Sequence, residues 1–198
     1  WADDPRDRDP ERPDLSRGSL AGDDPREPRQ RVDPREVFTE QLRLPRGEAR
    51  ERVDMPERSH DLRGSESRML ATVGAFRVVS ASDLRDRVDG PADPRRRDLR
   101  HLSEAGLVRT VTLDGRREPV VVLTDRGRDL LNAHRRDVPQ AERQTFHAGL
   151  RKPREVEHDS QVYRAYLEAA DRLHGREGRI TRVVLDYELK RDYQRFLH

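Results

Sequence analysis

The stretch DLRHLSEAGLVRTVTLDGRREPVVVLTDRGRDLL, residues 98–131, decides the fold of this 198-residue chain. It begins inside a helical segment, residues 94–105, whose leucines recur on one side. Two Val-rich segments follow, 107–111 and 119–123, with the turn signal Asp114-Gly115 between them. Because such a pair joined by Asp-Gly is typical of a hairpin, we expect two antiparallel strands here, followed by a helix capped by Thr124.

The segments upstream of this stretch complete a recognisable order of elements. Apolar residues recur at helical spacing after Ser65, a candidate N-cap: Met69, Leu70, Val73 and Phe76. Val78-Val79 predicts a short strand, and Ser80-Ala81-Ser82-Asp83 predicts the start of a short helix. The sequence therefore predicts helix, short strand, helix, helix, hairpin, helix, which is the order of a winged helix-turn-helix.

The second helix of a helix-turn-helix lies in the DNA major groove, and here that helix is residues 94–105. Five basic residues are left outside its leucine stripe: Arg95, Arg96, Arg97, Arg100 and His101. Guanidinium groups there can meet guanine O6 and N7 or hold phosphates. Arg116 and Arg117 at the hairpin tip would contact phosphate or a minor groove. The alternative is a solvated charged face, which Asp98 and Glu104 favour.

The stretch 98–131 resembles the winged-helix regulators of the MarR (multiple antibiotic resistance) type. The resemblance rests on a Leu-rich helix running into Gly-Leu-Val, an Asp-Gly-Arg-Arg tip, and a Leu-Thr-acid-x-Gly helix start. It implies the fold and DNA binding. We do not extend it to a small-molecule effector, because this chain has a Pro-rich polar tail where MarR-type regulators have a helical dimer arm. The same module occurs in plasmid and transposon mobilisation proteins.

Composition divides the chain into three parts. Charged residues make up 40% and hydrophobic residues 32%, too polar a balance for the whole chain to form a packed core. Repeated Asp, Arg and Pro near the start predict a disordered tail over residues 1–59, followed by the winged helix at 60–137 and an extension at 138–198. The cations are nearly all arginine, which suits phosphate contacts, although a GC-rich coding genome produces the same bias.

The extension is predicted as helix, strand and helix. Its first helix carries an apolar stripe: Val156, Tyr163, Tyr166, Leu167, Ala170 and Leu173. Residues 180–185 predict a strand, and apolar residues return at helical spacing from Leu189 to Leu197. Such a small unit needs the winged helix or a second copy of the chain to bury its apolar side, so we expect a homodimer formed through helix 156–173.

A nuclease-like alternative applies to the same extension. The winged helix, then His158-Asp159, then a strand leading to Tyr187-Glu188 is similar to the replication-relaxation family of mobile-element proteins. Asp186-x-Glu188-x-Lys190 also matches the strand ending of a Mg²⁺-dependent nuclease. On a strand the three side chains would share a face. On a helix residues 188 and 190 would point about 200° apart.

Other classes of site lack a sequence signal. The chain has no cysteine, no apolar run that could span a bilayer, no phosphate-cradling glycine loop and no nucleophile motif. His158 has no further metal ligands at a suitable spacing. We therefore expect a cytoplasmic protein that is not an enzyme, with no cofactor, no bound metal and no membrane partner.

The sequence as a whole predicts an α+β protein, a winged helix-turn-helix with a disordered N-terminal tail and a small helix-strand-helix C-terminal extension. The expected function is sequence-specific binding of double-stranded DNA, as a transcriptional regulator or as a mobile-element replication or mobilisation factor. Two alternatives stay open. One is the DNA-binding front end of a truncated nuclease-like protein, and the other is a winged helix that binds proteins and never touches DNA.

Overall fold

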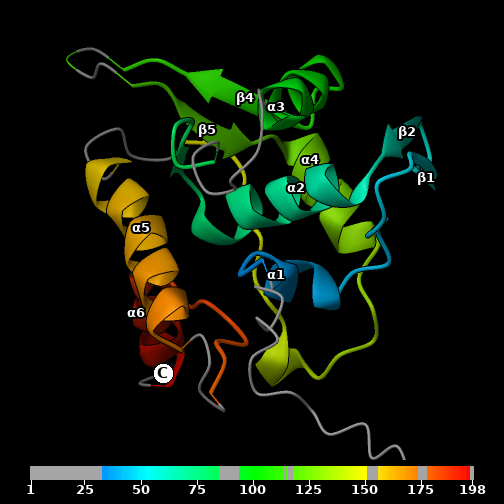
Figure 1. Ribbon diagram of the computed structural model, residues 1–198. Helices are drawn as coiled ribbons and strands as arrows, with labels where there is room; N and C mark the ends of the chain where they lie inside the picture. The colour runs from blue at the N-terminus through cyan, green and yellow to red at the C-terminus, as the bar shows by residue number, and fades with distance from the viewer. Residues whose placement is uncertain are drawn as a thin grey trace, which may run out of the picture. The chain divides into compact units, whose positions relative to one another are not determined.

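The computed structural model describes residues 33–84, 94–113, 115, 118–150, 156–173 and 178–196 (Figure 1). This part of the chain holds the following elements in order: α1 (Glu36–Glu40), β1 (Glu51–Asp54), β2 (Ser59–Leu62), α2 (Gly64–Phe76), β3 (Val79–Ser80), α3 (Pro94–Glu104), β4 (Val108–Val111), β5 (Val120–Leu123), α4 (Asp125–Ala133), the 3-10 turn η1 (Gln140–Glu142), α5 (Val156–Leu173) and α6 (Asp186–Phe196). The expected mixed α+β composition is confirmed.

Helix α2 is the centre of the core. Nearly all of its residues from Met69 to Phe76 are buried, and α1, α3, α4, α5 and strand β5 pack against it. Figure 1 shows α3 and the β4–β5 hairpin on one side of α2 and α1 on the other. The helix begins one residue before the expected cap Ser65, because the Glu66 carboxylate accepts the backbone N–H of Arg63 at 3.1 Å and so fixes the first turn.

Strands β3, β5 and β4 form an antiparallel sheet in that order. Val79 pairs with Val121 and Val108 with Leu123, so β5 lies in the middle and all four of its residues are buried. These three strands were expected from the sequence, and each is confirmed. Helix α3 begins at Pro94 as expected and ends at Glu104, one residue before the expected end. The short helix expected after Ser80 falls mostly on residues 85–93, which lie outside the described part, and residues 81–84 form a turn.

The ordered part of the chain begins well before residue 60. Residues 33–59, assigned from the sequence to the tail, contain α1 and β1, and four of their apolar side chains are buried: Phe38, Leu42, Leu44 and Val53. Strand β1 pairs with β2 in an antiparallel hairpin. The expected boundary at residue 59 is therefore wrong, because the charged residues around Val53 hid strand β1. Residues 1–32 of the expected tail lie outside the described residues.

Helices α5 and α6 belong to the same compact unit as α2. The rings of Tyr163 and Tyr166 lie 5.0 and 5.2 Å from the ring of Phe76 at the end of α2. Arg77 forms a nearly buried ion pair with Asp159 of α5. The apolar stripe of helix 156–173 is thus largely covered by its own chain, which contradicts the expectation that this stripe forms a dimer interface.

The strand expected at residues 180–185 is absent. The segment is extended, but the Gln144 side chain takes the place of a neighbouring strand: its amide accepts the N–H of Val183 at 2.9 Å and donates to the carbonyl of Val183 at 3.0 Å. One side chain can satisfy one residue in this way, so no ladder forms. The helix expected from Leu189 onward is confirmed as α6, which begins three residues earlier, at Asp186.

Candidate nucleic-acid interface

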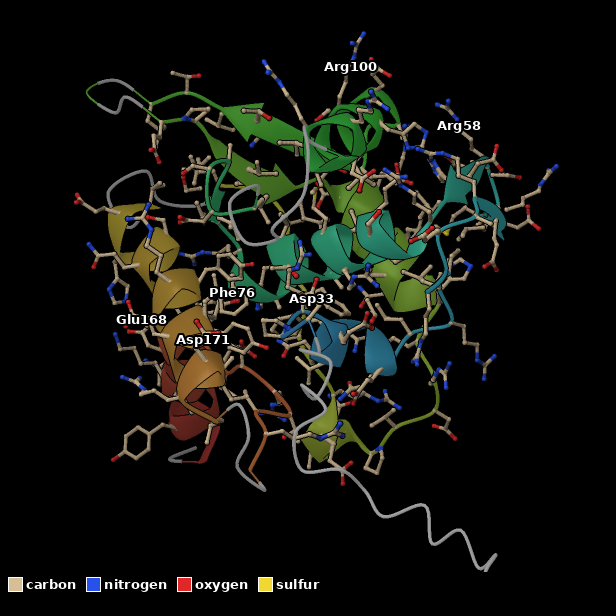
Figure 2. The ribbon with its side chains drawn as sticks, viewed as in Figure 1. Asp33, Arg58, Phe76, Arg100, Glu168 and Asp171 are labelled. Atoms are coloured by element: carbon tan, nitrogen blue, oxygen red, sulfur yellow. The ribbon has the colours of Figure 1, made fainter. Side chains whose placement is uncertain are left out.

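Helix α3 presents arginines on the side opposite its buried residues. Leu102 is fully buried and Leu99 is partly buried against the core, as the leucine stripe predicted. Arg96, Arg97 and Arg100 are exposed, and Figure 2 shows Arg100 directed away from α2. Arg95 lies in the first turn of α3, and its side chain is outside the described part. The structure therefore brings three of the predicted site residues onto one exposed face.

Asp98 does not share that face. Its side chain is fully buried and forms an ion pair with Arg63 at the start of α2, with Arg63 Nε 2.9 Å from Asp98 Oδ1. This hydrogen bond raises the pKa of the Arg63 guanidinium. The expectation that Asp98 lies among solvated charges is wrong, because a cation on α2 draws it inward. Among the described side chains, the exposed face of the first two turns of α3 carries guanidinium groups and no carboxylate.

Glu104 is the acid that remains near this face. Its Oε1 lies 2.8 Å from Arg100 Nε, and the two side chains are 60% and 80% exposed. The carboxylate raises the pKa of Arg100 through this hydrogen bond. Ion pairs so open to water are weak and are screened by salt. Arg100 can therefore exchange Glu104 for a phosphate or a base edge at small cost.

His101 has a different environment from the arginines. Its Nδ1 lies 2.9 Å from Oε1 of Glu66, whose side chain is fully buried in α2. Arg50, just before β1, holds the same carboxylate with two contacts of 2.7 and 2.8 Å. His101 thus ties α3 to α2 and to the β1–β2 hairpin, so it positions the helix, a role that its sequence position did not suggest.

The β4–β5 hairpin adjoins α3 and has one cation that sequence analysis missed. Arg109 of β4 is exposed between buried Val108 and exposed Thr110. Its polar side chain between the valines of the predicted strand 107–111 was the signal that could have found it. Gly115 has a φ of 80°, which favours glycine and fits the expected turn. The predicted contacts Arg116 and Arg117 lie outside the described residues.

The nuclease-like alternative required a strand at residues 186–190, and the structure has α6 there. Lys190 pairs on the surface with Asp186 at 2.9 Å, whereas Glu188 is buried and its Oε1 lies 3.3 Å from His147 Nε2. Burial raises the pKa of Glu188, but hydrogen bonds from His147, Thr145 and the Leu185 N–H outweigh it and lower the pKa. The three side chains do not share a face, which contradicts the nuclease strand.

Three comparisons with known proteins found no protein similar to this chain. No family model, no curated protein and no solved structure matches this chain. Within the described ranges, no three His, Asp or Glu side chains gather into a metal-ligand group, and no helix is both long and apolar enough to cross a membrane. The residues of α3 and of the surfaces around it are therefore the features of this chain that bear on its function.

Proposed function

We propose that residues 64–133 form a winged helix-turn-helix that binds double-stranded DNA sequence-specifically, with α3 as the recognition helix. The observation that carries the proposal is the inward turn of Asp98. Among the described side chains, it leaves Arg96, Arg97 and Arg100 as the charged groups on the exposed side of the first two turns of α3. A polyanion approaching that side meets three guanidinium groups and the positive end of a helix dipole.

The order of elements supports this reading. Helix α3 packs across α2, as a recognition helix packs across the first helix of the motif, and strands β4 and β5 form a hairpin next to it. The resemblance of residues 98–131 to MarR-type regulators points to the same fold. In this arrangement β4–β5 is the wing, and Arg109, Arg116 and Arg117 are the residues that would hold it on phosphate.

The proposed chemistry is groove recognition with no covalent step. Arg96, Arg97 and Arg100 would donate to guanine O6 and N7 or to phosphates, and each good base contact discriminates by about 1–3 kcal/mol. His101 would keep α3 in register through Glu66. We further propose that the protein binds as a homodimer on a palindromic site, in transcription control or in the replication or mobilisation of a mobile element.

The test is selection from a pool of random duplexes with the full chain and an Arg96/Arg97/Arg100→Ala variant. Wild type should enrich a sequence, and the variant should not. If the three arginines contact phosphates, the slope of log affinity against log salt should fall by about 2–3. A matched control, Arg164/Arg172/Lys190→Ala, removes the same charge from α5 and α6 and should select like wild type. Equal selection by all three proteins would refute the assignment of α3.

A further inference from the structure

A second group of arginines lies away from α3. Leu42 and Arg135 form an isolated antiparallel bridge, with Arg43 N–H donating to the His134 carbonyl at 2.7 Å and Arg136 N–H to the Gln41 carbonyl at 2.8 Å. This bridge joins the loop after α1 to the end of α4. The segment 179–182 reaches the same place, because the Arg182 guanidinium donates to the carbonyl of Ala141. We call Arg43, Arg46, Arg135, Arg136 and Arg182 the loop arginine cluster.

The cluster differs from the other arginines in its partners. Arg136 Nε donates to the Leu42 carbonyl at 3.0 Å, and Arg46 donates to the carbonyls of Thr39 and Glu40 at 3.4 and 3.3 Å. Within the described part of the chain, none of the five cluster arginines lies within 4.0 Å of a carboxylate. Carbonyl oxygens fix the orientation of a guanidinium group but do not neutralise its positive charge.

The local charge is therefore high. Segments 40–46, 134–143 and 179–182 together contain seven arginines and three acids, whereas the whole chain has a formal net charge of only +2. Two of the acids are engaged at the edge of the cluster, Glu40 with Arg179 at 3.0 Å and Asp137 with Arg143 at 3.8 Å. Arg43, Arg46 and Arg136 are exposed.

Arg135 adds an independent sign of an incomplete site. Its Nε donates to Asn132 Oδ1 at 3.0 Å, and its guanidinium lies 4.8 Å from the centre of the Phe146 ring. Its Nη1 is shielded from solvent and has no hydrogen-bond partner among the described residues. Burial, together with the positive charge of Arg143, lowers the pKa of Arg135. A bound anion would relieve this repulsion between like charges.

We propose that the loop arginine cluster is a second nucleic-acid surface, which holds a phosphate backbone without reading its sequence. This inference rests on the proposed function for the identity of the polyanion. A membrane is the less suitable partner, because the exposed large apolar side chains of the described residues, Leu189 and Tyr193, are on α6 and not in the cluster. Since α1 and η1 lie on the side of α2 away from α3 (Figure 1), the cluster would hold a second duplex segment.

The test measures whether one protein bridges two duplexes. The full chain is bound to an immobilised random-sequence duplex, and retention of a second, fluorescent duplex is measured. Wild type should retain the second duplex. An Arg43/Arg46/Arg136→Gln variant should retain at least tenfold less of the second duplex, and it should select the same sequence as wild type. The Arg164/Arg172/Lys190→Ala variant is the charge-matched control and should bridge normally. Thermal melting of each variant checks that it is folded.

The outcomes separate this inference from the proposed function. If the cluster variant bridges like wild type, the inference is overturned while the assignment of α3 stands. If the cluster variant loses bridging but the Arg96/Arg97/Arg100→Ala variant still selects its sequence, the inference holds and α3 is not the reader. Binding of wild type to phosphatidylglycerol vesicles, lost in the cluster variant with bridging unchanged, would overturn it in favour of a membrane. Absence of any duplex binding would overturn both.

Discussion

The ion pair between Arg63 and Asp98 sets the orientation of α3, and its removal gives the sharpest test of the structure. Asp98 is fully buried, so Asp98→Asn leaves the Arg63 guanidinium without its counter-charge beside the core. Breaking a fully buried pair costs about 3–5 kcal/mol. Because the Arg63 side chain is 26% exposed and can reach water, we expect a smaller loss than for a fully buried pair, about 2–3 kcal/mol.

The measurement is urea unfolding followed by circular dichroism, as a double-mutant cycle with Arg63→Gln. The double variant should lose less stability than the sum of the single variants, with a coupling energy of about 1–2 kcal/mol. At about 2–4 °C for each kcal/mol, Asp98→Asn should also lower Tm by about 4–12 °C. Glu104→Gln removes the exposed acid of the same helix and should leave the unfolding midpoint unchanged. A coupling energy below about 0.5 kcal/mol would refute the reasoning, because it would mean that the Arg63–Asp98 ion pair does not help to hold α3.

Three further changes test the core, its acid sensitivity and one close backbone approach. Phe76→Ala removes a fully buried ring that contacts Phe38 and two tyrosines of α5, so the free energy of unfolding should fall by about 3–5 kcal/mol. An unchanged urea midpoint would mean that α5 does not pack on this ring. Glu188 has a lowered pKa in the folded state, so its stabilisation is present above its ordinary pKa of 4.5 and is lost as pH falls through the folded value. Glu188→Gln should therefore destabilise the protein at neutral pH and match wild type in acid, and a constant difference across a pH series of melts would contradict this. Gly64→Ala should prevent tight packing at the start of α2, because a Cβ there would lie 2.0 Å from the Arg46 carbonyl oxygen; a variant with wild-type Tm would show that this loop moves freely.

Elements with regular local patterns were predictable from sequence. The strands β4 and β5 follow from Val-rich runs around Asp114-Gly115, and helix α3 follows from its leucine spacing. These signals are local, since each depends on residues a few positions apart. The face of α3 that carries Arg96, Arg97 and Arg100 follows from the same spacing, so this part of the candidate site could be predicted as well.

The parts that sequence analysis missed depend on distant partners. Asp98 lies four residues before buried Leu102, so helical spacing places it near the inner side of α3. The spacing does not show its partner, because Arg63 lies 35 residues earlier, at the start of α2. The segment around Val183 lacks a strand because a single glutamine side chain, Gln144, satisfies its backbone. Strand β1 holds one buried apolar residue, Val53, among exposed charged ones, so it resembles a polar tail until its pairing with β2 is known.

The arginine bias left two readings open in the sequence, a functional one and a genomic one, and the partners of each arginine now separate them in part. Arg50, Arg63 and Arg77 each hold a buried or nearly buried carboxylate, where a planar fork with several donors serves the fold. A uniform genomic excess would not by itself distribute the remaining arginines unevenly. Those without a nearby carboxylate include Arg97 on α3 and the loop arginine cluster at the other side of α2. Because no carboxylate balances their charge, their concentration on two surfaces is the reason to look for polyanions at both.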